Sequence, residues 1–159
     1  MTDLQFGTKA PDFNFPAVGK GVLDLTGSPF VVFFYPRAGT PGCTNEVLDF
    51  SGKLEAFHAL GVNVVGVSPD DPAKLTKFRD KHAVSVDLVP DPDLDIIKRW
   101  GVWGEKRLYG RTFMGVERSS FLVDSAGKIA AVWRKVRVPG HAEAVLAAAK
   151  TLPSKPGAA

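Results

Sequence analysis

Short apolar runs bounded by turn residues predict the strands of a buried sheet. The clearest run, residues 30–35, consists only of β-branched and aromatic side chains, as expected for a strand covered on both faces. Shorter or interrupted runs of the same kind occupy residues 22–25, 62–67 and 86–89. Two further runs flank the turn residues 124–127, which predicts an antiparallel hairpin between Arg118 and Lys135.

Apolar side chains three and four residues apart predict the helices. One such stripe consists of Cys43, Val47, Phe50, Leu54 and Phe57. A helix that begins after Thr40 and ends at Gly61 would bury this stripe. Asp71 and Asp91 each precede a proline, a pairing of cap and first-turn residue that predicts a helix to about residue 83 and a short one ended by Gly101. A last helix is expected from about residue 141 to 152.

The order of these elements predicts the fold class. Strand–helix–strand units are followed by a hairpin and a final helix, which favours an α/β fold with a central mixed sheet flanked by helices. Thioredoxin-like folds have this plan, and an N-terminal extension and an inserted segment would be added to it here. We expect one domain over residues 1–152 and a disordered, Pro/Gly/Ala-rich tail over residues 153–159.

Composition and charge limit the partners and the cell compartment that we expect for the protein. The 159-residue chain has a formal charge of +3, and its basic residues are scattered, which argues against a nucleic-acid partner. No apolar stretch approaches the ~18 residues of a membrane span, and the N-terminus lacks the basic and apolar parts of a signal peptide. A single cysteine cannot form an internal disulfide, so we expect a cytoplasmic protein.

Cys43, the only cysteine, lies where the strand at residues 30–35 passes into the predicted helix. The first turn of a helix has free N–H groups and the positive end of the helix dipole, so a thiol there is easier to ionise to the reactive thiolate. Because the apolar stripe begins at Cys43, its sulfur should face a pocket floor. Full conversion to thiolate gains only about 30-fold in rate, roughly 2 kcal/mol, so further donors are needed.

Four residues are candidates for this further stabilisation. Thr40 would cap the helix by accepting from the N–H of Gly42 or Cys43 and would keep its hydroxyl proton for a ligand. Gly42 has no side chain that could cover the sulfur. Arg118 begins the predicted hairpin and offers a permanent cation with forked donors. Glu46, one helical turn after Cys43, could hold that guanidinium in place.

These residues resemble a known family. The pattern Pro36-x-x-x-Thr40-x-x-Cys43 is similar to the signature of the peroxiredoxins, and residues 34–44 look like their Q-type group, also called bacterioferritin comigratory protein. Residues 101–106, 115–124 and 135–141 also resemble motifs of that group, in the expected order. The resemblance spans about residues 7–152, nearly the whole chain.

The resemblance implies a reaction and roles for the candidate residues. Cys43 would attack the O–O bond of hydrogen peroxide or a small alkyl hydroperoxide, release water or an alcohol, and become a sulfenic acid. Thr40 and Arg118 would hold the peroxide, Pro36 would shield the sulfur, and Glu46 would support Arg118. No metal, haem or flavin cofactor is implied, and Q-type relatives are mostly monomeric, so we expect a monomer.

The chain departs from the group in one respect. Many Q-type members carry a resolving cysteine five residues after the first one or on the next helix, and these places here are Leu48 and about Arg79. An external thiol, from thioredoxin, a glutaredoxin or glutathione, would therefore reduce the sulfenic acid. The first turn of the catalytic helix is expected to unwind when the sulfenic acid meets that thiol.

Two other functions stay open at this point. Without a resolving cysteine, the protein could be a peroxide-sensing thiol protein or a partner-binding module without efficient turnover. A Cys–His hydrolase would need a histidine within hydrogen-bond reach of Cys43. His58, His82 and His141 fall on the face, at the end and at the start of predicted helices, where we expect solvated or capping residues.

Overall fold

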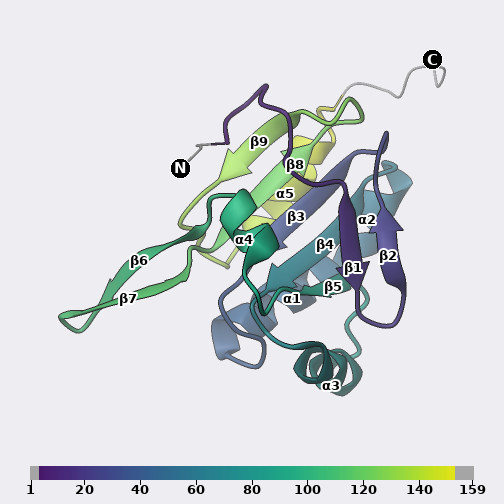
Figure 1. Cartoon of the computed structure of the whole chain (residues 1–159). Helices are drawn as coiled ribbons and strands as arrows, with labels where there is room; N and C mark the ends of the chain where they lie inside the picture. Colours follow the sequence, from purple (N-terminus) through teal and green to yellow (C-terminus); the bar gives the residue numbers. More distant parts are fainter. Residues whose placement is uncertain (1–3, 153–159) are drawn as a thin grey trace, which may run out of the picture.

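A mixed sheet forms the centre of the computed structural model, which describes residues 4–152. Five strands lie in the order β5-β4-β3-β8-β9 (Figure 1). They are β3 (Phe30–Phe34), β4 (Asn63–Ser68), β5 (Asp87–Pro90), β8 (Ser119–Val123) and β9 (Ile129–Trp133). The first three run parallel to one another, whereas β8 and β9 pair antiparallel. The predicted thioredoxin-like α/β fold is confirmed.

Helices and loops cover both faces of the sheet. Side chains alternate along β3, so Val31 and Phe33 face one hydrophobic core and Val32 and Phe34 face the other. The first core lies under α1 (Pro41–Gly52), α2 (Leu54–Ala59), α3 (Pro72–His82) and α5 (His141–Ala149). The second lies under α4 (Asp95–Arg99) and the N-terminal segment. All five residues of β3 are buried, as its continuous apolar sequence predicts.

Strand pairing places two distant parts of the chain together. β3 and β8 are antiparallel neighbours, with Phe34 opposite Ser119. The end of β3, where the chain turns into α1, therefore lies beside the start of β8. Arg118 directly precedes β8, so this register brings it to the edge of the sheet where α1 begins.

Two helices differ from the sequence prediction. The single helix expected from Thr40 to Gly61 is divided at Lys53 into α1 and α2. Gly52 is a weak helix former, and the Ser51 hydroxyl accepts hydrogen bonds from the backbone of Ser85 and Val86 instead of remaining on a free helix surface. The short helix expected at Asp91 begins later, at Asp95, although the Asp91 carboxylate still accepts from the Ile97 N–H at 2.8 Å.

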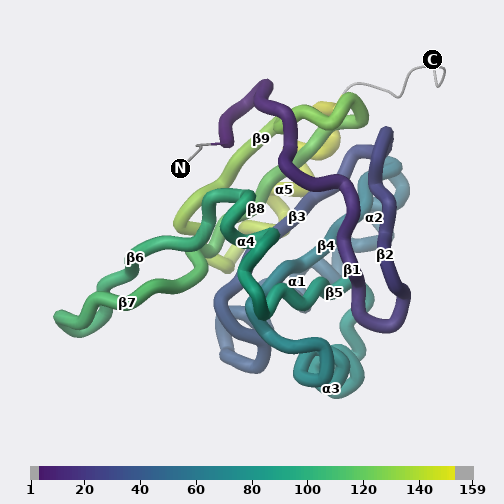
Figure 2. Tube along the Cα trace, viewed as in Figure 1, coloured from purple at the N-terminus to yellow at the C-terminus, as the bar shows by residue number. Residues whose placement is uncertain are grey.

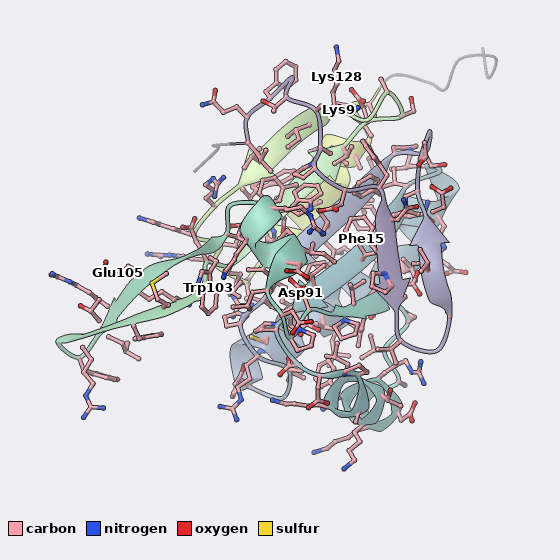
Figure 3. All side chains as sticks on the ribbon, viewed as in Figure 1. Lys9, Phe15, Asp91, Trp103, Glu105 and Lys128 are labelled. Carbon is pink, nitrogen blue, oxygen red and sulfur yellow. The ribbon has the colours of Figure 1, made fainter. Side chains whose placement is uncertain are left out.

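Two small antiparallel pairs complete the fold. β1 (Asn14–Ala17) pairs with β2 (Gly21–Asp24) in the N-terminal extension. Phe15 of β1, labelled in Figure 3, has its ring centroid 5.6 Å from that of Phe30. β6 (Trp103–Leu108) pairs with β7 (Arg111–Val116) in the inserted segment. The sequence pattern missed the second pair because its strands are largely exposed, and polar and apolar residues do not alternate along them.

The remaining expectations concern the ends of the chain and the membrane. Residues 153–159, predicted to be a disordered tail, lie outside the described residues. Within residues 4–152, no helix has the length and apolar character that crossing a membrane requires.

Candidate active site

Cys43 is the third residue of α1 and is almost fully buried. Thr40 precedes the helix in an extended conformation, Pro41 is its first residue, and the Thr44 N–H donates to the Thr40 carbonyl at 2.9 Å. Only 2% of Cys43 is exposed, and it belongs to the core that also contains Tyr35 and Val47. The sulfur thus lies at the inner side of the first helical turn, where the apolar stripe predicted it.

Arg118 joins the thiol to a carboxylate. Its Nη2 donates to Sγ of Cys43 at 3.2 Å, and its Nη1 donates to Oε1 of Glu46 at 2.5 Å. The arginine side chain is 18% exposed and that of Glu46 1%. A guanidinium held in this way can stabilise negative charge on the sulfur and on an oxygen that departs beside it.

Burial dominates the electrostatics of this group. It raises the pKa of Glu46 from 4.5 to about 7, although the positive charge of Arg118 opposes this rise. Oε2 of Glu46 has no hydrogen-bond partner among the described residues. Burial lowers the pKa of Arg118, but Glu46 and Cys43 raise it by more, so the guanidinium stays charged. One carboxylate oxygen therefore orients Arg118, and the other is available for a proton near neutral pH.

Thr40 occupies the expected cap position but uses its hydroxyl differently. Oγ1 donates to the carbonyl of Arg37 at 2.9 Å, and no side-chain cap bond to Gly42 or Cys43 forms. The expectation of a capping oxygen with a free proton was wrong. Because the hydroxyl proton of Thr40 is donated to the Arg37 carbonyl, Oγ1 can take part in a further hydrogen bond only as an acceptor.

Pro36 and Gly42 border the same loop and helix start. Pro36 is half-buried immediately after Tyr35. Gly42 is exposed, and a Cβ built on it would lie 3.6 Å from Nη2 of Arg118. The missing side chain therefore leaves the guanidinium nitrogen that contacts Cys43 uncovered on this side.

Asp70 supports the site, and the sequence analysis did not identify it. Its Oδ2 accepts from the Ala38 N–H at 2.7 Å and from the Ser68 hydroxyl at 2.8 Å, and Lys74 pairs with its Oδ1 at 2.9 Å. These bonds fix the loop that leads to α1. A polar residue just after β4 could have indicated this, because the carboxyl ends of neighbouring parallel strands meet at one edge of a sheet.

Lys106 and Tyr35 are two further groups near the site that the sequence analysis missed. Nζ of Lys106 donates to the Val116 carbonyl at 2.8 Å. Burial and the positive charge of Arg118 lower the pKa of Lys106, against an opposing effect of Cys43. Burial raises the pKa of Tyr35, with smaller contributions that include Cys43 and Glu46. A second cation and a neutral phenol thus lie within electrostatic range of the thiol.

The histidines give no partner for Cys43 in the described part of the chain, where its sulfur accepts from Arg118 and from no imidazole. His141 is buried, and its Nε2 forms a 2.7 Å hydrogen bond with Oγ of Ser120, so the expected solvated or capping role was wrong. The pattern missed this because α5 packs its first turn against Phe50 and Trp133. No group of residues in 4–152 has the side chains and spacing to hold a metal ion.

Comparison with known proteins gives a consistent answer over nearly the whole chain. A model of the AhpC/TSA family matches residues 6–132. A Mycobacterium tuberculosis protein that carries the peroxiredoxin name is 46% identical over 143 residues, 88% of this chain and 91% of the relative. Peroxiredoxin Bcp of Bacillus subtilis is 37% identical over 155 residues, 96% of this chain and 99% of the relative.

Solved structures agree with the sequence relatives. The bacterioferritin comigratory protein of Xanthomonas campestris has a TM-score of 0.82 at 37% identity, covering 92% of this chain and 96% of that one. The chain belongs to the AhpC/TSA family and, within it, to the Q-type or Bcp peroxiredoxins, as a member with a single cysteine.

Proposed function

We propose that the protein is a thiol peroxidase in which Cys43 reduces hydrogen peroxide and small organic hydroperoxides by a one-cysteine mechanism. The observation that carries this proposal is the guanidinium of Arg118, which contacts Sγ of Cys43 and is held by a buried carboxylate of Glu46. Peroxiredoxin relatives and the alkyl peroxide reduction activity named for the Xanthomonas campestris protein support it.

In the proposed reaction, the thiolate of Cys43 attacks one peroxide oxygen while the O–O bond breaks. The sulfur is oxidised to a sulfenic acid, and the departing oxygen takes a proton and leaves as water or an alcohol. Arg118 stabilises the charge that develops on both atoms. Oγ1 of Thr40 accepts a hydrogen bond from the peroxide O–H, because its own proton is donated to Arg37.

Pro36, Gly42 and Glu46 have supporting roles in the proposal. Pro36, half-buried beside the start of the loop, limits the access of water to the sulfur. Gly42 leaves room for the peroxide beside Arg118. Glu46 fixes the orientation of the guanidinium, because its Oε1 lies 2.5 Å from Nη1.

Reduction of the sulfenic acid requires a thiol from another molecule, because the chain has one cysteine. That thiol attacks the sulfenic sulfur, water leaves, and a mixed disulfide forms; a second thiol then releases Cys43. We propose thioredoxin, a glutaredoxin or glutathione as the source. A monomer in the cytoplasm, where Cys43 stays reduced between turnovers, fits this scheme.

The decisive experiment measures peroxide consumption by the reduced protein, with Cys43→Ser as the blank. We expect oxidation of Cys43 to be at least a thousandfold faster than that of free cysteine, one thiol lost per peroxide, and turnover when dithiothreitol is added. Oxidation no faster than that of free cysteine would overturn the proposal.

A peroxide sensor is the second candidate, favoured by the missing resolving cysteine. It would oxidise rapidly but turn over slowly with every reductant. The same assay, run in parallel with glutathione, glutaredoxin and thioredoxin systems, separates the two functions, because only the peroxidase sustains peroxide consumption.

A further inference from the structure

The hairpin β6–β7 exposes apolar side chains that the proposed chemistry does not use. It extends away from the rest of the molecule (Figures 1 and 2). Leu108, Tyr109, Phe113 and Met114 are 56%, 95%, 44% and 54% exposed. A concavity of about 670 Å³ is lined by Leu108, Tyr109, Arg111, Thr112 and Phe113. A two-stranded ribbon has no core of its own, so much of the apolar surface of these side chains remains exposed to solvent.

The tip of the hairpin holds an aromatic side chain in an unfavourable backbone conformation. Tyr109 and Gly110 connect the strands with φ of +52° and +74°. Positive φ at both positions is typical of a tight hairpin turn that favours Asn or Gly, and a bulky residue there is strained. Tyr109 gains no packing in return, since it is almost fully exposed. Strain without internal compensation points to a contact with another molecule.

Charge limits the kind of molecule that fits this surface. The hairpin carries Lys106, Arg107 and Arg111 against one acid, Glu105. Among the described residues, Arg107 and Arg111 form no ion pair. A second copy of this chain would bring the same arginines together around a twofold axis, so like charges would oppose self-association. An acidic partner with an apolar patch is complementary in both respects.

The base of the hairpin lies at the candidate active site. β7 ends at Val116, two residues before Arg118, and Figure 3 shows Trp103 nearer the body of the molecule than Glu105 along β6. Six-residue strands extend about 20 Å. A domain of about 100 residues, with a radius of gyration near 13 Å, can therefore contact the hairpin and still reach the region of Cys43.

We propose that the β6–β7 hairpin is the docking surface for an acidic thiol protein that reduces oxidised Cys43. This inference rests on the proposed peroxidase function. The partner thiol attacks the sulfenic sulfur, water leaves, and an intermolecular disulfide forms. A second thiol of the partner then displaces Cys43, so the partner leaves with the disulfide and two electrons pass to the peroxidase. Weak complexes between redox proteins commonly bury less than about 1,200 Å² of surface in total. A ribbon of this size can supply one side of such an interface.

Two double variants test the surface, with thioredoxin and its reductase as the probe. Tyr109→Gly with Phe113→Ser removes apolar area and relieves the strained φ, so the fold should be retained. Arg107→Glu with Arg111→Glu reverses the charge. Two controls accompany them: Val22→Ser, at an apolar position on β2 whose 68% exposure lies between those of Phe113 and Tyr109, and Lys128→Glu, at an exposed lysine away from the hairpin in Figure 3.

We expect both hairpin variants to lower kcat/KM for thioredoxin at least tenfold, and the controls to change it less than twofold. Oxidation by hydrogen peroxide and turnover with dithiothreitol should stay at the wild-type level, and added salt should lessen the difference between wild type and the charge-reversed variant.

Several results would overturn the docking surface. One is a kcat/KM for thioredoxin that stays within twofold of wild type in both hairpin variants. Another is a loss of turnover with dithiothreitol that matches the loss with thioredoxin in these variants. A wild type that turns over with dithiothreitol but with neither thioredoxin nor glutaredoxin also contradicts it. The proposal is also contradicted if the hairpin variants leave kcat/KM for thioredoxin unchanged but abolish either a dimer seen in sedimentation or binding to phosphatidylglycerol vesicles. If wild type consumes no peroxide even with dithiothreitol, the peroxidase function itself fails.

Discussion

Nη2 of Arg118 lies 3.2 Å from Sγ of Cys43, although 75 residues separate the two in sequence. The contact results from the pairing of β3 with β8, which aligns Phe34 with Ser119. Because the second guanidinium nitrogen of Arg118 is occupied by Glu46, the orientation toward the sulfur is fixed before any peroxide arrives. Such fixed donors act on developing charge without reorganising during the reaction.

Replacement of Arg118 should slow oxidation of Cys43 more than it changes the fold. We expect Arg118→Ala to reduce the second-order rate constant with hydrogen peroxide by 10²–10³-fold, the usual loss for one preorganised donor. Arg118→Lys keeps the charge but lacks the planar fork of donors that contacts Cys43 and Glu46 together, and should recover only part of the rate. Stopped-flow oxidation measures both, and an Ala variant within threefold of wild type contradicts the assigned role.

Glu46→Gln should change how stability depends on pH. In the folded protein the carboxyl has a pKa of about 7 instead of 4.5, so between these values the folded state holds a proton that the unfolded state has released. Stability contributed by this site therefore falls as pH rises from about 4.5 to 7, by about 3 kcal/mol. Urea unfolding should show wild type losing stability relative to the Gln variant across this window.

Glu55→Gln is the matched control for that series, because Glu55 is an exposed acid on α2. Its unfolding free energy should follow wild type at each pH. A constant difference between wild type and Glu46→Gln from pH 4.5 to 7 would show that Glu46 is ionised throughout.

His141 should contribute to stability with the opposite sign. Burial, aided by the charge of Arg118, lowers its pKa from 6.5 to about 4, so the unfolded state binds a proton first as pH falls. Stability is then lost between about pH 6.5 and 4, by ~2 kcal/mol once solvent screening is allowed for. His141→Gln should flatten this part of the unfolding profile, whereas the exposed His58→Gln should leave it unchanged. An unaltered slope in His141→Gln would contradict the assignment.

A cysteine introduced at Leu48 should restore an internal disulfide. Leu48 is on the exposed side of α1, five residues after Cys43, and side chains at that spacing point in different directions on a helix. Peroxide should therefore oxidise both thiols of Leu48→Cys only if α1 opens locally. We expect one disulfide per chain by mass spectrometry, and loss of dimedone labelling at Cys43.

Leu60→Cys is the comparison for this experiment, since Leu60 is also exposed but lies after the end of α2. Its oxidised form should keep the labelled sulfenic acid. Persistent labelling in Leu48→Cys would show that the first turns of α1 do not unwind.

Local sequence signals predicted the elements in which neighbouring residues decide the structure. The apolar run of β3 and the cap of α3, where Asp71 accepts from the Lys74 N–H at 2.8 Å, follow from short-range chemistry. The β6–β7 hairpin escaped detection because an exposed ribbon has no alternation between buried and exposed positions.

The candidate site was only partly predictable. Residue spacing predicted the helix-start position of Cys43, but Arg118 was identified mainly through the family resemblance, because strand pairing and not spacing brings it near. The Thr40 hydroxyl could either accept from a backbone N–H at the start of the helix or donate to the Arg37 carbonyl, and the sequence alone cannot decide between these two bonds. His141 lies among residues of three other elements, so its burial depends on tertiary packing.

The interruption at Lys53 makes the segment that carries Cys43 a short cooperative unit. A helix of 12 residues is marginal by itself in water, so α1 persists through the contacts that Val47 and Phe50 make with the core. Fraying of its N-terminal end need not propagate into α2, whose Phe57 N–H is bonded to the Lys53 carbonyl. Within α1, amide exchange should accordingly be fastest at the N-terminal end, where Cys43 lies. Oxidation and local unfolding therefore involve the same few residues of the chain.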